Sequence, residues 1–278
     1  MLITVQAALI QARQRVAPLD ARVLLRHVLQ CSDAFIIAHA DESLTQAEAT
    51  VFESLSQRRV KGEPVAYLTG VREFYGRDFT VTADVLIPRP DTELLVSLAL
   101  EHLPFAGTVG HPSILELGCG SGCVVLSIAL EREGLEAWGL DLSDEALVVA
   151  RENALRLKAP SVQWLKSDWF EALPTIRFDV VLSNPPYIQK EDGHLQQGDL
   201  RFEPRLALVA EDGGWACLEK IIQRAATHLK PQGWLLLEHG FEQARGCRER
   251  LQASGFRKVQ SWTDLAGIER VSGGLCPV

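Results

Sequence analysis

The sequence predicts an α/β protein in which a small helical module precedes a mainly parallel sheet with helices on both faces. Three observations lead to this fold class. Apolar residues recur at helical spacing through residues 1–60, and from residue 91 onward helical and strand-like stretches alternate. Between these parts, residues 73–87 show strand-like alternation around a turn signal at residues 76–78, which indicates a β-hairpin.

Length and composition are those of an ordinary globular protein. The chain has 278 residues, of which 47% are apolar and 23% are charged, and its net charge is −8. This acidic balance gives no reason to expect direct binding to nucleic acid or to an anionic membrane. No apolar run approaches the roughly 18 residues of a membrane span, and Arg13 and Arg15 follow the first apolar stretch, unlike the charges of a signal peptide. The six cysteines are scattered without a CxxC pair, so we expect free thiols, no metal site and a cytoplasmic location.

The helical module is expected at residues 1–75. Its apolar residues recur at three- to four-residue spacing in residues 5–16 and again in residues 21–28. Thr45 and Glu48 form a capping-box pattern that opens a further helix. The module carries eight basic and eight acidic residues, so it is not a basic arm for nucleic acid.

The main domain is expected at residues 91–278, after a hairpin linker at residues 76–90. Its strands are predicted at residues 113–117, 136–142, 162–166, 178–184, 233–240, 256–262 and 268–274. The intervening helices are predicted at residues 91–103, 123–131, 144–157, 215–229 and 241–254. In such sheets, ligands bind outside the C-terminal ends of the strands, so the residues that end the strands are the candidate site.

The stretch ELGCGSG, at the end of the first of these strands, is a candidate ligand-binding turn. Its glycines let the backbone turn sharply and approach a ligand, and the free N–H groups of the following helix favour an anion. A GxGxxG fingerprint would need glycine where Cys123 stands, which weakens a dinucleotide interpretation; a carboxylate would suit the turn equally. A tight strand–helix turn without a ligand is the alternative. The candidate residues are Gly118, Cys119, Gly120, Ser121 and Gly122.

The second strand of this set ends at Asp141, 19 residues after Gly122. An acidic residue there can accept hydrogen bonds from both hydroxyls of a ribose. Alternatively, Asp141 caps the next helix, although Ser143 or Asp144 can also do so. Together with the glycine turn, Asp141 predicts a ribose-bearing cofactor.

Three candidates follow the short strand VQWLK. Asp168 can accept a hydrogen bond from an exocyclic amine, and the ring of Trp169 or Phe170 can lie against a purine. A tryptophan in the core is at least as common, so this hypothesis depends on the neighbouring sites.

A polar and aromatic elbow ends the strand VVLS. The two prolines that follow Asn184 cannot continue a central strand, because neither has an N–H for the ladder. Asn184 offers a side-chain carbonyl and Pro185 a backbone carbonyl, so the pair can hold both hydrogens of a planar –NH₂ group. Pro186 stiffens the elbow and Tyr187 can lie against the plane of that group. A purely structural strand stop is the alternative.

Six stretches resemble one enzyme family. GEPVAYLTGVREFYG, LIPRPDTELLV, ELGCGSG, SNPPYI, LRFEPRLALVAEDGG and LLLEHG are similar to the release factor glutamine methyltransferase family. The resemblance extends from about residue 60 to the C-terminus, and the helical module fits it too. The set of motifs is specific, whereas NPPY alone is shared with enzymes that methylate adenine N6.

The resemblance implies a seven-stranded, Rossmann-like methyltransferase domain that ends in an antiparallel hairpin and uses S-adenosyl-L-methionine. The implied reaction is methyl transfer to the side-chain nitrogen, N5, of the glutamine in the Gly-Gly-Gln motif of peptide chain release factors. By motif position, Gly118–Gly122, Asp141, Trp169 and Asn184 would contact the cofactor, and Asn184–Tyr187 would hold the glutamine amide. Arg89 would line the substrate entrance without a catalytic role.

Two other functions are weighed against this one. A nucleic-acid adenine N6 methyltransferase would use the same elbow, but the acidic net charge and the neutral helical module oppose it. A non-catalytic scaffold would show an altered NPPY or lack the acid at the strand end, and both are intact.

Overall fold

The computed structural model describes residues 3–104, 111–159 and 162–277, and its contacts divide the chain into two compact units. The first unit comprises Met1–Val71 together with His194–Phe202, and the second comprises Arg72–Gly193 together with Glu203–Val278. Among the residues that the structure describes, none of the helices has the length and apolar character of a membrane span.

The first unit is helical, as its spacing predicts. Its helices are α1 (Val5–Arg13), α2 (Pro18–Leu29), α3 (Asp33–Ala38), α4 (Gln46–Val60) and α5 (Val65–Thr69), with the 3-10 turns η2 (Gly193–Gln196) and η3 (Gly198–Arg201). The predicted capping box is present, since the Thr45 hydroxyl accepts from the Glu48 N–H at 3.2 Å and the Glu48 carboxylate accepts from the Thr45 N–H at 2.7 Å. Arg59 joins the later segment to α2, because it pairs with Asp20 at 2.7 Å and with Asp199 at 3.5 Å.

The predicted hairpin consists of β1 (Val71–Phe74) and β2 (Arg77–Thr80). Its turn lies at Tyr75 and Gly76, one residue earlier than predicted, and both residues have positive φ, 50° and 73°. A two-residue turn with both φ values positive matches the twist of the flanking strands, which explains the shorter turn.

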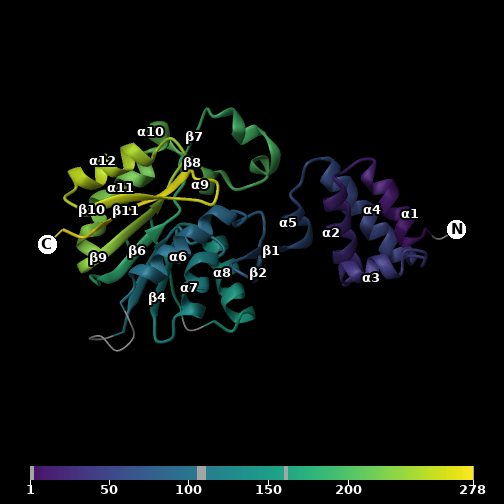
Figure 1. Cartoon of the computed structure of the whole chain (residues 1–278), viewed down its shortest axis with the longest axis horizontal. Coiled ribbons are helices and arrows are strands. Elements are labelled where there is room, and N and C mark those ends of the chain that lie inside the picture. The colour runs from purple at the N-terminus through teal and green to yellow at the C-terminus, as the bar shows by residue number, and fades with distance from the viewer. Residues whose placement is uncertain (1–2, 105–110, 160–161, 278) are drawn as a thin grey trace. The chain divides into compact units, whose positions relative to one another are not determined.

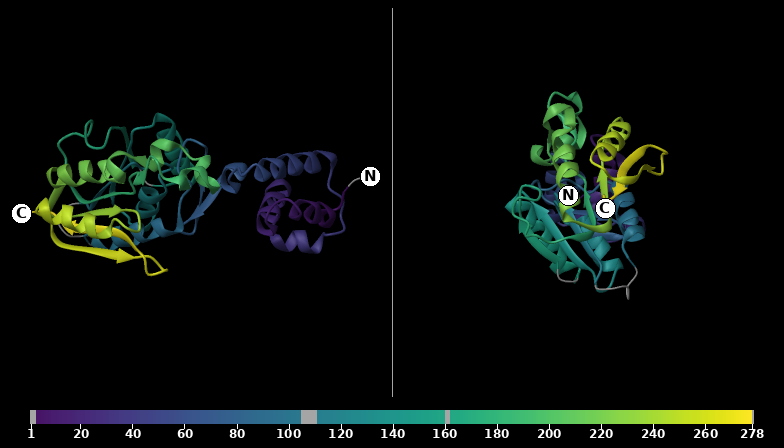
Figure 2. Two further views of the ribbon diagram at one scale, coloured as in Figure 1. Left: turned by 90° about the horizontal axis from the view of Figure 1, so that it is seen from above. Right: turned by 90° about the vertical axis from the view of Figure 1, so that its left-hand side faces the viewer.

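The second unit is built on a seven-stranded sheet of the predicted Rossmann-like class. Its spatial order is β10-β11-β9-β6-β3-β4-β5. The strands are β3 (Ser113–Leu117), β4 (Glu136–Asp141), β5 (Val162–Lys166), β6 (Phe178–Ser183), β9 (Leu229–Glu238), β10 (Arg257–Thr263) and β11 (Glu269–Leu275). Strands β9, β6, β3, β4 and β5 are parallel to one another, whereas β11 is antiparallel to β9 and β10. The hairpin of β10 and β11 therefore forms one edge of the sheet (Figure 2).

Helices cover both faces of this sheet (Figure 1). One face packs against η1 (Pro90–Thr92) with α6 (Glu93–His102), α7 (Cys123–Glu131) and α8 (Asp144–Arg156). The other packs against α11 (Ala216–Ala225), which continues into η4 (Ala226–His228), and α12 (Ala244–Ala253). Alternate residues of each strand supply the two cores; Ile114 faces α6 and α7, whereas Leu115 faces α11 and α12.

The chain between β6 and α11 forms an excursion that the sequence does not predict. It contains β7 (Ile188–Gln189), α9 (Arg205–Leu208), β8 (Val209–Ala210) and α10 (Glu211–Gly214), and β7 pairs with β8 in a separate parallel ribbon. The returning part of this excursion, residues 203–210, supplies part of the site described next.

Candidate active site

Three neighbouring strands end together at one edge of the sheet. Leu117 of β3 pairs with Leu140 of β4 on one side and with Ser183 of β6 on the other. Asp141, which ends β4, therefore lies along one edge with Gly118 and Asn184, which follow β3 and β6, as expected for strands in parallel register. A cavity of about 400 Å³ opens there.

Most of the predicted site residues line this cavity, and some do not. The lining includes Gly118, Gly120, Asp141, Asp168, Trp169, Asn184 and Pro186. The described residues Cys119, Ser121, Gly122, Pro185 and Tyr187 are not part of it. Cys119 and Ser121 are buried, 3% and 2% exposed, so their side chains belong to the core behind the turn.

The glycine turn requires its glycines for two different reasons. Gly118, Gly120 and Gly122 have φ values of 68°, 53° and 75°, a region that other residues rarely adopt. At Gly122 an added Cβ would lie 3.0 Å from the Trp164 ring and 3.2 Å from the Ala150 Cβ, so close packing excludes a side chain. At Gly120 nothing lies within 4 Å of that position, which leaves the backbone open to the cavity.

Asp141 holds the glycine turn while it lines the cavity. Its Oδ2 accepts from the Gly120 N–H at 2.8 Å, and its Oδ1 accepts from the Ser143 N–H at 3.0 Å. Burial raises the pKa of the Asp141 carboxyl, and these backbone hydrogen bonds act against that rise. The next helix is capped by Ser143, whose hydroxyl accepts from the Ala146 N–H at 3.0 Å, so the capping alternative for Asp141 is wrong.

The two aromatic candidates after β5 have different surroundings. Trp169, with a positive φ of 51°, lines the cavity beside Gly118, where an added Cβ would lie 3.7 Å from the indole ring. Phe170 is 1% exposed and stacks on His228 with ring centroids 4.8 Å apart. Phe170 is therefore a core residue, and Trp169 is the aromatic surface of the site.

The proline elbow is tied to its neighbours by side-chain hydrogen bonds. The Ser183 hydroxyl donates to the Leu117 carbonyl at 2.7 Å, and the Asn184 amide Nδ2 donates to the Thr92 hydroxyl at 3.2 Å. Because Nδ2 is engaged, the carbonyl oxygen Oδ1 is the end of the Asn184 amide that is left for a ligand. Burial raises the pKa of Tyr187, so its hydroxyl remains protonated near neutral pH.

The structure adds site residues in the segment 204–209 and at Leu142, which the sequence did not single out. Arg89, which was expected at the substrate entrance, is not part of the cavity lining and pairs with the buried carboxylate of Glu203, which also accepts from the Ile87 N–H at 3.0 Å. This contact fixes the start of the segment 204–209, of which Pro204, Leu206, Ala207 and Val209 line the cavity. Leu142 also lines it and is 46% exposed. The sequence did contain a signal for Leu142, because this apolar residue directly follows Asp141, the acid at the end of its strand.

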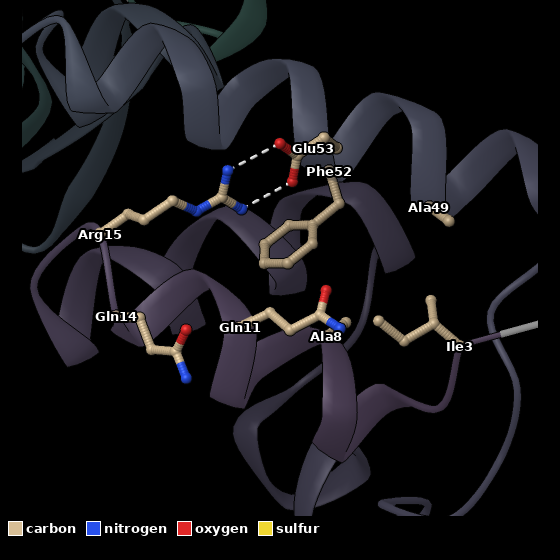
Figure 3. Close-up of a pocket in the computed structure, with 8 residues that line it drawn as sticks. All are labelled: Ile3, Ala8, Gln11, Gln14, Arg15, Ala49, Phe52 and Glu53. Carbon is tan, nitrogen blue, oxygen red and sulfur yellow. Dashed lines mark hydrogen bonds and ion pairs between the residues drawn. The ribbon is translucent and has the colours of Figure 1, made fainter.

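A second cavity, of about 630 Å³, lies in the helical unit (Figure 3). Its lining contains Phe52 and the ion pair of Arg15 with Glu53, joined by two hydrogen bonds of 2.7 Å. The Arg15 guanidinium lowers the pKa of Glu53 to about 2. Both side chains are more than a third exposed, so this is a surface ion pair and not a catalytic arrangement.

Comparisons with known proteins identify the family and the fold. The model of the PrmC N-terminal domain matches residues 1–70, and that of the methyltransferase small domain matches residues 92–200. A release factor glutamine methyltransferase of Burkholderia pseudomallei is 49% identical over 93% of this chain and 92% of its own length. A release factor glutamine methyltransferase of Escherichia coli is 43% identical over 92% of this chain and 91% of its own length. A solved methyltransferase of Pyrococcus furiosus, 17% identical, shares the fold with a TM-score of 0.54 over 81% of this chain and 100% of its own. The chain therefore belongs to the release factor glutamine methyltransferase family, as its sequence motifs predicted.

Proposed function

We propose that this enzyme transfers a methyl group from S-adenosyl-L-methionine to the side-chain nitrogen N5 of the glutamine in the Gly-Gly-Gln motif of peptide chain release factors. The observation that carries the proposal is the oriented amide of Asn184 at the edge of the cavity. The family relationship over 93% of the chain supports the same substrate. This substrate places the activity in the cytoplasm and requires no contact with nucleic acid.

The residues around the cavity fit this cofactor. A volume of about 400 Å³ is within the range of small-molecule sites. The Asp141 carboxylate can accept from ribose hydroxyls, and Asp168 can accept from an exocyclic amine. Trp169 and Leu142 offer apolar surface for a purine ring. When bound, S-adenosyl-L-methionine supplies an electrophilic methyl carbon and leaves as a neutral thioether.

The elbow residues would orient the substrate nitrogen. An amide nitrogen is a poor nucleophile, because its lone pair is delocalised into the carbonyl. Asn184 Oδ1 and the Pro185 backbone carbonyl would accept its two hydrogens, while the Tyr187 ring lies against the amide plane. The bond from nitrogen to carbon forms as one N5 proton leaves to solvent. Fixing the reacting group in this way contributes several kcal/mol, on the order of 7–11 in the best-oriented reactions.

Labelled cofactor and purified release factor test the proposal directly. We expect one methyl group on the glutamine of the Gly-Gly-Gln motif, located by mass spectrometry, and no label after that glutamine is replaced. Duplex DNA under the same conditions is the control for the adenine N6 alternative and should remain unlabelled. Label in DNA, or label that persists in a release factor without the glutamine, would refute the proposed substrate.

A further inference from the structure

An ion pair with a buried carboxylate lies behind the wall of the cavity. The Glu203 side chain is fully buried, and the Arg89 side chain that contacts it is 32% exposed. One carboxylate oxygen of Glu203 accepts from the Ile87 N–H at 3.0 Å, and the other accepts from the Arg89 guanidinium. Neither Glu203 nor Arg89 is among the described residues that line the cavity. Because charges lose water on burial, such a pair often adds little net stability, which directs attention to the geometry that it fixes.

Glu203 joins two segments of the cavity wall. It is the first residue of the second unit after the segment His194–Phe202, and the segment 204–209 that follows it lines the cavity at four positions. Residues 83–86, which directly precede Ile87, line the cavity as well. The hydrogen bonds of Glu203 therefore hold these two wall segments together.

Arg89 connects the same contact to the proline elbow. Its backbone carbonyl accepts from the Thr92 N–H at 3.1 Å, and the Thr92 hydroxyl accepts from the Asn184 Nδ2 at 3.2 Å. The short segment 87–92 therefore contacts Glu203 at one end and supports the Asn184 amide at the other.

We propose that Glu203 is a positioning residue for methyl transfer, which acts through Ile87 and Arg89 to hold the wall segment 204–209 against the segment that supports Asn184. The inference rests on the proposed function, because that function places the cofactor against this wall and the substrate amide at Asn184. A displacement of about 1 Å between reacting groups can cost about a hundredfold in rate. Glu203 therefore fixes the separation of the cofactor from the substrate nitrogen without touching either of them.

The first test needs neither cofactor nor substrate. Glu203→Gln keeps the shape of the side chain and an acceptor for the Ile87 N–H, but it removes the charge that pairs with Arg89. Hydrogen–deuterium exchange of the cofactor-free protein, followed by mass spectrometry, should become at least tenfold faster in residues 83–89 and 204–210 and stay unchanged in β3. Unchanged exchange in both segments, or exchange that is accelerated equally throughout the protein, would overturn the inference.

Asp179→Asn is the matched control for this test. Asp179 is also a carboxylate that accepts from a backbone N–H and from a cation, since it binds the Ser113 N–H and the Lys230 Nζ, each at 2.8 Å. Ser113 begins β3, and none of these three is among the described residues that line the cavity. We expect Asp179→Asn to leave exchange in the two wall segments, cofactor release and kcat unchanged. Equal changes in Asp179→Asn and Glu203→Gln would show general destabilisation and refute the positioning role.

Cofactor release and turnover give the second test. Stopped-flow tryptophan fluorescence reports cofactor release, since Trp169 lines the cavity. S-adenosyl-L-methionine should leave Glu203→Gln at least tenfold faster than it leaves the wild type, and kcat with a release factor should fall at least tenfold. Arg89→Met should cause similar losses, and Arg89→Lys, which keeps the cation, should recover part of them.

A double variant shows whether Glu203 acts through Arg89. Glu203→Gln combined with Arg89→Met should lose no more activity than the worse of the two single variants, because both changes break one contact. Losses that multiply in the double variant would refute this route of action.

The outcomes separate the two proposals. Wild-type rates of cofactor release and turnover in Glu203→Gln, with the release factor methylated, refute the positioning role and leave the proposed function intact. A wild-type enzyme that does not methylate the release factor refutes the proposed function, while hydrogen exchange still decides whether Glu203 holds the two wall segments together.

Discussion

Asp141 and Glu238 stand at the C-terminal ends of two strands of the same sheet, and burial raises the pKa of both, yet their surroundings differ. Each oxygen of Asp141 accepts from a backbone N–H, Gly120 on one side and Ser143 on the other. Glu238 is 3% exposed, and among the described residues its Oε2 has no hydrogen-bond partner.

This difference separates a ligand-binding acid held by backbone donors from a buried acid that lacks a donor on one oxygen. Backbone donors are held by the fold and favour the charged form, so Asp141 can present a permanent acceptor to a cofactor hydroxyl. No donor holds Oε2 of Glu238 in its charged form among the described residues, and burial raises the pKa of this carboxyl to about 7. Burial alone therefore does not define the role of an acid at the end of a strand. The hydrogen-bond donors around its carboxylate also decide that role.

The largest expected effect is at Asn184, the oriented amide at the edge of the cavity. Asn184→Ala removes the oriented acceptor, so turnover should fall on the order of a hundredfold or more, with little change in thermal stability. Initial rates with labelled cofactor and a release factor measure it. A near wild-type rate in Asn184→Ala would show that the elbow does not hold the substrate through this side chain.

Stability as a function of pH compares the two acids directly. The folded-state pKa of Glu238, about 7, lies above its ordinary value of 4.5, so the folded protein binds the proton more tightly than the unfolded chain does. The stability from this group is fully present below about pH 4.5 and is lost as the pH rises through 7, by about 3 kcal/mol in total. Glu238→Gln should therefore gain stability over the wild type between pH 5 and pH 8.

Urea unfolding at pH 5 and at pH 8 measures this gain in the free energy of unfolding. Asp141→Asn is the matched control and should show a smaller pH-dependent difference, because backbone hydrogen bonds oppose the rise in the pKa of Asp141. If the free energies of unfolding of Glu238→Gln and Asp141→Asn depend on pH to the same extent, the contrast between the two acids is wrong.

Cofactor affinity tests the proposed role of Asp141 as a ligand-binding acid. Asp141→Ala should weaken binding of S-adenosyl-L-methionine by about 1–3 kcal/mol, because charge-assisted hydrogen bonds are lost. Calorimetry measures this change. Asp144→Ala is the control, since Asp144 is an exposed carboxylate that pairs with Lys166 and does not line the cavity. Unchanged affinity in Asp141→Ala would exclude Asp141 from the site, and a preference for NAD would overturn the cofactor itself.

The glycine turn and its acid could be predicted because each is a local signal at the end of an apolar strand. The strand 113–117 and the helix 123–131 have the predicted bounds, since their apolar runs end at glycine and charged residues. Consecutive parallel strands bring the turn and Asp141 to one edge, so their proximity also followed from the sequence.

The hydrogen bond from Asn184 to Thr92 could not be predicted, since the two residues are far apart in the sequence. Thr92 belongs to a short 3-10 turn before α6, and α6 packs on β6, the strand that leads into Asn184. The burial of Glu238 at the end of β9 could not be predicted either. Sequence rules also expect a glutamate to be exposed. The excursion after Tyr187 was missed for a different reason: β7 and β8 have two residues each, too few to show a period.

Tyr187 should give the smallest effect, and it tests whether the aromatic ring of the elbow contacts the substrate amide. Tyr187→Phe keeps the ring that lies against the substrate amide and removes a hydroxyl that burial keeps protonated, so the rate should fall less than about tenfold. Tyr187→Leu, which removes the ring, should lose more. Initial rates with labelled cofactor and a release factor measure both variants. Equal losses in Tyr187→Phe and Tyr187→Leu would show that the ring has no role of its own against the substrate amide.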